Sequence, residues 1–314
     1  MIRINKSHKE KDISLMGKVI KEGTARFAKK REEQNLENKY NPPPIKKWKT
    51  LEGEFITFNA ERIDTKNFPM ILTTPKDIKE KKYIILQLHG GGYEKALLNY
   101  NTYFAKYYMR NNSIEVLTPN YRVAPEDKFP AALEDSVTAY KWLLENGYLA
   151  ENIIIVGDSA GGGLALSTVM VLIKNKIKLP KAIITMSAWT DLACTLTSYK
   201  NNKEVDPLFG GVERPLIYSS RYAEGLDKTN PYISPYYGDF KGFPKMLMQV
   251  GTHEMLYDDT IKVADKARSQ NVDVTLSEYD GMFHVFQAFR GVLKEANEAW
   301  DEVDKFIKEV FLLE

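Results

Sequence analysis

The sequence predicts an α/β fold in which a mostly parallel sheet carries helices on both faces. From residue 82 onwards, segments of strand length alternate with segments of helical length. The run at 153–156 reads Ile-Ile-Ile-Val, and so short a run that is apolar throughout suits a strand buried on both faces. Ligands of such sheets bind at the carboxyl ends of the strands, so polar residues that follow a strand are the first candidates for a functional site.

Size and composition indicate one large domain with a modest appended part. The 314 residues are 43% hydrophobic and 11% aromatic, which is enough for a substantial core. No apolar run approaches the roughly 20 residues of a membrane span, and the first ten residues lack the apolar stretch of a signal peptide. Cys194 is the single cysteine, which excludes an internal disulfide and a cysteine-ligated metal site. We therefore expect a cytoplasmic protein without a membrane span.

The charge is small overall but unevenly spread along the chain. A net charge of +2 argues against nucleic-acid binding. Residues 1–50 hold 14 Lys and Arg against 6 Asp and Glu, whereas the rest of the chain holds 30 against 36. The basic segment is either an arm that touches anionic lipid or an acidic partner, or the solvated face of an amphipathic helix that covers the main domain. We favour the second interpretation.

Each element has its own signal in the sequence. Residues 12–34 place apolar side chains at helical spacing and predict one or two helices, and the run Asn41-Pro-Pro-Pro44 marks a linker after them. Residues 190–235 break the later alternation and predict an insertion with a helix or two. Strands are expected at 54–60 and 68–74, as an antiparallel pair, and at 82–89, 114–121, 152–156, 182–187, 245–250 and 273–279; the other helices are expected at 96–112, 131–146, 164–174, 257–270 and 286–311.

The strand at 152–156 leads into the turn Gly157-Asp-Ser-Ala-Gly161 and then into an apolar helix. Strand, G-x-S-x-G and helix form the context of a nucleophile elbow, in which Ser159 is strained and its hydroxyl is lifted clear of the sheet. A side chain at Gly157 or Gly161 would collide with the facing strand or helix. The N–H group of Ala160 points to where an oxyanion would develop. The alternative is a glycine-rich helix start that only packs closely on a strand.

A second glycine-rich motif, His89-Gly-Gly-Gly92, follows the strand that ends near residue 88. Glycines let main-chain N–H groups approach a ligand, and H-G-G-G in this place is typical of the second wall of an oxyanion hole. Gly91 and Gly92 are the donor candidates, whereas His89 and Gly90 are expected to support the loop. By itself, the triplet could form any tight turn.

A general base is expected late in the chain, after an acid. His284 follows the last predicted strand, where apolar neighbours can fix its ring. The loop after the strand at 245–250 offers Glu254, Asp258 and Asp259 as the acid. The two aspartates fall where a helix begins and are explained by N-terminal capping or by pairing with the helix dipole, which leaves Glu254 to hold the imidazole of His284.

These motifs resemble those of the hormone-sensitive-lipase-like α/β hydrolases, the group of bacterial short-chain carboxylesterases. The likeness runs from about residue 50 to the C-terminus, in the family's order and spacing. In this family the acid is usually an aspartate, and Glu254 stands at its position here, so the carboxylate is kept on a side chain one methylene longer. The matching stretches are 89–93, 121–126, 157–162, 189–191, 234–235 and 251–259, together with His284.

The resemblance implies an α/β-hydrolase core at 51–189 and 236–314. A small helical cap over the site would come from an N-terminal segment, 1–50, and from an insertion, 190–235. Arg122 and Glu126 are implied to support the loops around the site, and no metal or organic cofactor is implied.

The implied activity is that of a serine carboxylesterase, which cleaves short-chain acyl esters, acetyl to about hexanoyl, through an acyl-enzyme intermediate. Ser159 would be the nucleophile, His284 the base and Glu254 the acid. Two alternatives stay open: an amidase or peptidase with the same triad, and a non-catalytic small-ligand receptor on the same fold, which would lack the base. The expected partner is a small ester, and the strand at 273–279 offers an edge through which two copies can pair as a homodimer.

Overall fold

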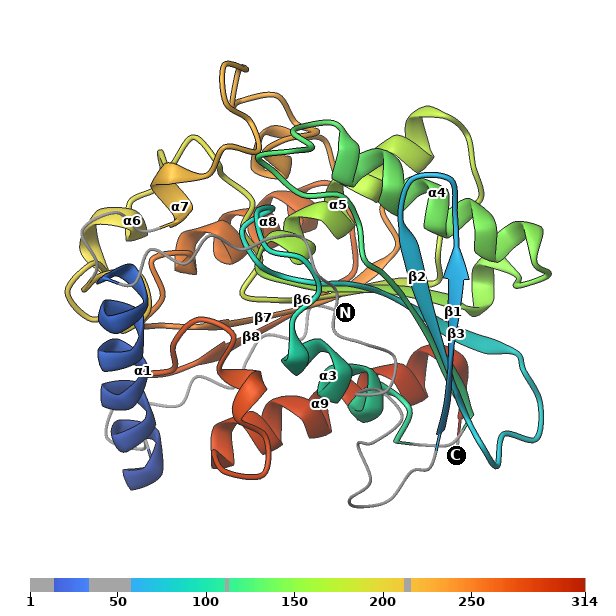
Figure 1. Ribbon diagram of the computed structural model, residues 1–314, viewed down its shortest axis with the longest axis horizontal. Coiled ribbons are helices and arrows are strands. Elements are labelled where there is room, and N and C mark those ends of the chain that lie inside the picture. The colour runs from blue at the N-terminus through green and yellow to red at the C-terminus, as the bar shows by residue number, and fades with distance from the viewer. Residues whose placement is uncertain (1–13, 34–57, 111–112, 212–215, 314) are drawn as a thin grey trace.

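The computed structural model describes residues 14–33, 58–110, 113–211 and 216–313 (Figure 1). Within them, eight strands form one sheet in the order β1-β2-β4-β3-β5-β6-β7-β8. The neighbours from β4 to β8 are parallel, and β1 and β2 add an antiparallel pair at one side. The strands are β1 (Phe58–Asp64), β2 (Pro69–Pro75), β3 (Tyr83–Leu88), β4 (Ile114–Pro119), β5 (Ile153–Asp158), β6 (Ala182–Met186), β7 (Lys245–Gly251) and β8 (Val274–Tyr279). The predicted fold class is thereby confirmed.

Helices cover both faces of the sheet (Figure 1). On one face lie α4 (Ala131–Glu145), α5 (Ala160–Lys174) and α8 (Tyr257–Ser269), and on the other lie α3 (Asn99–Tyr108) and α9 (Lys294–Phe311). Successive residues of β5 point to opposite layers, because side chains alternate along a strand. Ile153 and Ile155 belong to the core under α4 and α5, and Ile154 and Val156 belong to the core under α3 and α9.

Several expected elements differ from the structure in their bounds, and two of these differences have a local cause. β1 continues through the charged residues Glu61, Arg62 and Asp64, where the predicted strand had ended at residue 60. β1 is an edge strand with one solvent-facing side, so polar side chains are tolerated there. The predicted helix at 286–311 is split into a short 3₁₀ turn, η4 (Phe286–Phe289), and α9, because Gly291 takes a left-handed φ of 84° between them.

The N-terminal helix and the insertion lie beside the sheet (Figure 1). α1 (Leu15–Glu33) falls within the helical segment predicted at 12–34. Its start is tied to α9, because the backbone N–H and the hydroxyl of Ser14 both donate to the carboxylate of Glu295, at 2.8 and 3.0 Å. Ile20 packs on the cluster around Phe283. The insertion holds α6 (Ser198–Asn201) and α7 (Leu216–Ser219), followed by η3 (Pro235–Tyr237).

Two features bear on possible partners. β8 lies at the edge of the sheet, as expected for 273–279, and its pairing with a second copy stays a prediction. In the described ranges, every helix is too short or too polar to cross a membrane.

Candidate active site

Ser159 occupies the sharp turn between β5 and α5. Its φ of 53° and ψ of −124° are unusual for a residue with a side chain, and such strain persists only where neighbours enforce it. Two backbone hydrogen bonds of 2.9 Å do so: the Ser159 N–H donates to the carbonyl of Met186, and the Trp189 N–H donates to the carbonyl of Ser159. Both partners belong to the end of β6 and the loop after it, so the neighbouring strand fixes the turn.

The glycines beside Ser159 are required by close backbone contacts. A Cβ at Gly157 would lie 2.1 Å from the carbonyl oxygen of Gly161, and a Cβ at Gly161 would lie 2.1 Å from that of Leu88. A Cβ at Gly163 would lie equally close to the carbonyl oxygen of Trp189. The predicted collisions with the facing strand and helix are thereby confirmed. They also explain why α5 begins at Ala160 rather than at the expected residue 164, since close packing here outweighs the low helix propensity of three glycines.

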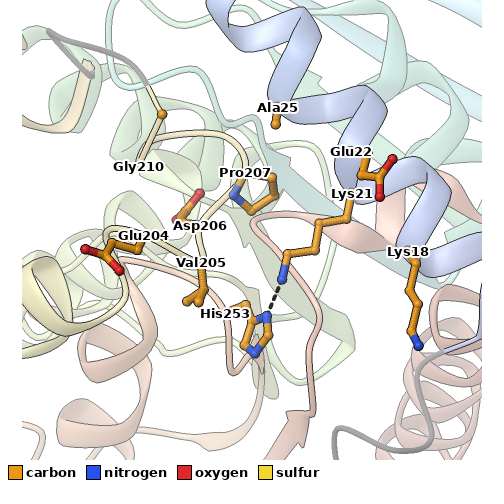
Figure 2. A pocket seen from close by; sticks show the side chains of 11 residues that line it. Lys18, Lys21, Glu22, Ala25, Glu204, Val205, Asp206, Pro207, Gly210 and His253 are labelled. Carbon is orange, nitrogen blue, oxygen red and sulfur yellow. Dashed lines mark hydrogen bonds between the residues drawn. The ribbon is translucent and has the colours of Figure 1, made fainter.

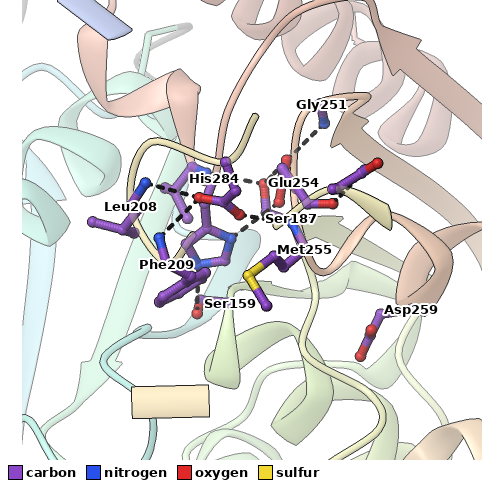
Figure 3. A network of polar contacts seen from close by, with 12 residues as sticks. Ser159, Ser187, Leu208, Phe209, Gly251, Glu254, Met255, Asp259 and His284 are labelled. Carbon is purple, nitrogen blue, oxygen red and sulfur yellow. Dashed lines mark hydrogen bonds and ion pairs between the residues drawn. The ribbon is translucent and has the colours of Figure 1, made fainter. Parts of the chain in front are cut away.

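The structure brings Ser159, His284 and Glu254 into one hydrogen-bonded chain (Figure 3). His284 Nε2 lies 2.8 Å from Ser159 Oγ, and His284 Nδ1 lies 3.0 Å from Glu254 Oε2. Ser159 is 8% exposed, His284 is 7% exposed and Glu254 is fully buried. The three side chains follow three different strands, β5, β8 and β7, at the carboxyl edge of the sheet. A hydroxyl, an imidazole and a carboxylate in this order can generate a nucleophile.

The carboxylate of Glu254 has two further donors, one of which the sequence analysis missed. Its Oε1 accepts the hydroxyl of Ser187 at 2.7 Å and the N–H of Gly251 at 2.6 Å. The same Ser187 oxygen accepts the N–H of Val285 at 3.0 Å. Ser187 directly follows β6, so its position after a buried strand was a signal that could have found it.

Asp258 and Asp259 point away from His284 and tie the insertion to the core instead. Asp258 accepts the N–H of Ser198 at 2.9 Å, and Asp259 accepts the N–H groups of Thr190 and Asp191 at 2.6 and 2.8 Å. Burial raises the pKa of Asp259 well above its usual range. Neither side chain caps α8, so the capping role is corrected to one of anchoring the start of the insertion. Both carboxylates lie in the first turn of α8, where pairing with the helix dipole requires them.

His89 organises the glycine loop from within the core. Its Nδ1 lies 2.9 Å from the carbonyl oxygen of Gly90, and its ring is stacked on Tyr121, with centroids 3.9 Å apart. Burial lowers the pKa of His89 to about 4, against a smaller opposing effect of the bond to Gly90. The ring is therefore neutral near pH 7, and the proton on Nδ1 makes it a donor to Gly90.

Gly91 and Gly92 have positive φ values of 130° and 64°. Among the residues that the structure describes, no acceptor receives a hydrogen bond from the N–H groups of Gly91, Gly92 or Ala160. Backbone donors without an internal acceptor near a reactive hydroxyl are what an oxyanion hole requires.

Asp158, next to Ser159, is a second residue that the sequence analysis did not single out. Its carboxylate accepts the N–H of Gly90 at 3.2 Å and the hydroxyl of Tyr100 at 2.6 Å. Burial raises the pKa of Asp158 to about 6, although these hydrogen bonds favour the ionised form. Asp158 thus joins the turn of Ser159 to the glycine loop.

The expectation that Arg122 and Glu126 support the loops around the site is corrected in part. Arg122 bonds to Asp135 through its Nε and Nη2, at 3.0 and 2.8 Å, and its Nη2 also lies 3.2 Å from Glu134. Glu126 is exposed and makes no hydrogen bond or ion pair with any described residue. The buried partner is therefore Asp135, in the first turns of α4, whereas the side chain of Glu126 faces solvent.

The insertion reaches the site through the loop around Asp206. This buried carboxylate accepts the N–H groups of Met255, Leu208 and Phe209 at 2.7 to 2.9 Å. The ring of Phe209 lies 4.9 Å from that of His284, centroid to centroid. The loop thus covers the imidazole on the side of the insertion.

A pocket of about 540 Å³ separates α1 from the loop at 204–211 (Figure 2). Lys21 of α1 contacts Nδ1 of His253 there, so His253 joins the N-terminal helix to the loop that carries Glu254. In the described part of the chain, no group of three His, Cys, Asp or Glu side chains gathers in a way that could hold a metal ion.

Comparison with known proteins agrees with this geometry. Residues 85–288 match the family described as alpha/beta hydrolase fold. An acetyl-hydrolase of Streptomyces hygroscopicus is 35% identical over 224 residues, which cover 71% of this chain and 75% of that protein. An esterase of Acinetobacter venetianus is 30% identical, over 71% of this chain and 74% of the relative.

Solved structures agree over nearly the whole chain. The structure of EstE5 from a crystal soaked with p-nitrophenyl butyrate superposes on this chain with a TM-score of 0.76 at 33% identity. The match covers 92% of this chain and 99% of the EstE5 chain. An esterase from the bacterial hormone-sensitive lipase family gives a TM-score of 0.80 at 29% identity, over 94% of this chain and 98% of its own. The chain therefore belongs to the hormone-sensitive-lipase-like α/β hydrolases and is a carboxylic ester hydrolase.

Proposed function

We propose that Ser159, His284 and Glu254 form the catalytic triad of a carboxylesterase that works through an acyl-enzyme. The hydrogen-bonded chain from Ser159 Oγ through the imidazole to Glu254 carries this proposal. His284 Nε2 removes the hydroxyl proton as Ser159 Oγ attacks the ester carbonyl, and it returns that proton to the leaving alcohol. Water then attacks the acyl group with the same base, which releases the acid and restores the hydroxyl. Glu254 holds the Nδ1–H tautomer and stabilises the imidazolium.

The negative oxygen of each tetrahedral intermediate is assigned to the N–H groups of Gly91, Gly92 and Ala160. Their lack of an acceptor among the described residues supports this assignment. Donors that are already fixed when charge develops cost no reorganisation, and loss of one typically costs about 3 kcal/mol of transition-state stabilisation.

The proposed substrates are short acyl esters, from acetyl to about hexanoyl. The residues expected to form the cap, 1–50 and 190–235, lie partly outside the described ranges. Within those ranges, the site is covered by Phe209 and the buried Asp206, and Ser159 is only 8% exposed. A covered site favours small acyl groups, and one relative is named for acetyl hydrolysis. A cytoplasmic location is part of the same proposal and rests on the single cysteine.

Hydrolysis of p-nitrophenyl acetate by the wild type and by Ser159→Ala tests the nucleophile. We expect the variant to lose nearly all activity, by a factor on the order of 10⁴ or more. Ser167→Ala is the matched control, because Ser167 lies on α5, the helix that follows Ser159, and its buried hydroxyl has no partner in the described structure. Equal rates for wild type and Ser159→Ala would contradict a serine mechanism, and no turnover by the wild type would favour a receptor.

Two further measurements address the finer claims. A series of p-nitrophenyl esters of increasing acyl length is expected to show kcat/KM falling beyond hexanoyl, and a maximum at long chains would contradict the proposed specificity.

Acid quenching during turnover is expected to trap the acyl group on the peptide that contains Ser159, which mass spectrometry detects.

A further inference from the structure

Three consecutive residues of the insertion, Ser220, Arg221 and Tyr222, contact the glycine loop, and we call them the strap. The hydroxyl of Ser220 donates to the carbonyl oxygen of Gly92 at 3.1 Å. The Arg221 N–H donates to the carboxylate of Glu94 at 2.5 Å, and its guanidinium lies 3.4 Å from the same oxygen. The ring of Tyr222 is stacked on that of Tyr93, with centroids 3.9 Å apart and planes 7° from parallel. These three contacts join segments that lie more than 120 residues apart in the sequence.

Contacts on carbonyl oxygens decide where the N–H groups of this loop point. In a trans peptide, the C=O of one residue and the N–H of the next lie in one rigid plane and point in opposite directions. His89 holds the carbonyl of Gly90 and so aims the N–H of Gly91. The N–H groups of Glu94 and Lys95 hold the carbonyl of Gly91, at 3.2 and 3.1 Å, and so aim the N–H of Gly92.

The strap completes this arrangement from outside the core. Glycines restrict their own backbone little, so Gly91 and Gly92, at φ 130° and 64°, depend on external contacts for a fixed conformation. Ser220 fixes the peptide that joins Gly92 to Tyr93, which aims the N–H of Tyr93 and limits rotation about the ψ of Gly92. Arg221 holds the side chain of Glu94, whose N–H is one of the two donors to Gly91.

The strap is itself anchored to the core, so it can transmit a fixed position. Tyr222 is only 1% exposed, and its carbonyl accepts the N–H of Phe129 at 2.8 Å. The ring of Phe129 packs edge-on against that of Tyr222, at 5.9 Å. Lys128, directly before Phe129, and Glu224, two residues after Tyr222, form an ion pair, although both are exposed and contribute little.

We propose that the strap positions the oxyanion loop, with Ser220 and Arg221 as positioning residues that hold the backbone directly after Gly92 and thereby restrict how far the Gly91 and Gly92 N–H groups can turn, without touching the substrate. The proposal rests on the proposed function in one respect only, the assignment of these N–H groups to the oxyanion. The insertion then does more than cover the site, because it also aligns the donors.

Two variants of Ser220 test the proposal by kinetics. Ser220→Ala removes the donor to Gly92 and is expected to lower kcat for p-nitrophenyl acetate about tenfold with little change in KM, since misaligned donors weaken the transition state selectively. It should weaken inhibition by an alkylboronic acid, which forms a tetrahedral adduct with serine, by a similar factor. Ser220→Thr keeps the hydroxyl and is expected to stay within about threefold of the wild type. A loss confined to KM, or no loss at all, would overturn the proposal.

Matched variants separate alignment from general damage to the insertion. Thr229→Ala removes another hydroxyl of the insertion, one whose single partner among the described residues is Asp227 at 2.7 Å, and is expected to leave kcat unchanged. Glu94→Gln keeps an acceptor for the Arg221 N–H, whereas Glu94→Ala removes it. Glu94→Ala is therefore expected to lower kcat and Glu94→Gln to preserve it. An equal loss in Thr229→Ala would overturn the assignment to the strap.

Amide hydrogen exchange tests the strap without relying on catalysis. In Ser220→Ala, exchange in the peptide that covers 89–95 is expected to accelerate, while exchange at 157–163 stays as in the wild type. If the wild type lacks esterase activity but Ser220→Ala still accelerates exchange at 89–95, the positioning role of the strap is supported and the proposed function is contradicted. If the wild type is active and Ser220→Ala changes neither kcat nor exchange, the positioning role of the strap is contradicted and the proposed function is kept.

Discussion

The hydroxyl of Ser187 links Glu254 to the residue that follows His284. It donates to Glu254 Oε1 at 2.7 Å and accepts the N–H of Val285 at 3.0 Å. Val285 has a positive φ of 53°, which a β-branched residue adopts only when its neighbours impose it. Ser187 thus fixes both the carboxylate and the loop that carries the imidazole, and the end of β6 becomes part of the site.

Replacement of Ser187 by alanine is expected to lower kcat roughly 10- to 100-fold with KM nearly unchanged, because one charge-assisted hydrogen bond contributes about 1.5 to 3 kcal/mol. Steady-state kinetics with p-nitrophenyl acetate measures the effect, and Ser167→Ala again serves as the control. A variant with wild-type kcat would show that the remaining Gly251 N–H holds Glu254 sufficiently.

Glu254→Ala and Asp258→Ala are expected to act on different properties. The first removes the partner of His284 Nδ1 and should lower kcat by a factor on the order of 10³ to 10⁴. The second leaves the N–H of Ser198 without its 2.9 Å acceptor and should cost about 1 to 2 kcal/mol of unfolding free energy while most activity remains. Activity assays and urea denaturation of both variants measure the two effects. A larger loss of kcat in Asp258→Ala than in Glu254→Ala would reassign the acid to Asp258.

The sequence predicted best those features whose geometry is local or follows from strand order. G-x-S-x-G between an apolar strand and an apolar helix dictates the turn of Ser159, and the glycine contacts bear this out. Because parallel strands end at one edge, residues that directly follow strands could be assigned to one site. His284 and Glu254 were chosen on that basis, and they lie within hydrogen-bond distance of each other.

Features that depend on pairing between distant segments could not be read from the chain. Arg122 has several acidic residues nearby in the sequence, and only the packing of α4 decides that Asp135 rather than Glu126 is its buried partner. The bond between Ser220 and Gly92 likewise depends on how the insertion folds back, for which no local pattern exists.

Asp158 should make stability depend on pH in a defined direction. Its pKa of about 6 in the folded protein exceeds the ordinary value of 3.8, so the folded state binds this proton more tightly. The resulting stability is present below about pH 4 and is lost as the pH rises through about 6. Relative to Asp158→Asn, which cannot titrate, the wild type should lose about 3 kcal/mol of unfolding free energy over this range. Urea denaturation at a series of pH values measures the difference, and a constant difference would contradict the predicted titration.

Gly161→Ala is expected to prevent correct folding, whereas Gly23→Ala should be tolerated or stabilising. A Cβ at Gly161 would lie 2.1 Å from the carbonyl oxygen of Leu88, which belongs to β3 and cannot move without disturbing the centre of the sheet. Gly23 lies inside α1 with nothing within 4 Å of its added Cβ, so alanine gains about 1 kcal/mol of helix propensity there. Soluble yield and the midpoint of thermal unfolding are the measurements. A Gly161→Ala protein with the wild-type midpoint and activity would show that β3 and α5 can separate at no cost, which contradicts the close packing that holds Ser159 in its strained turn.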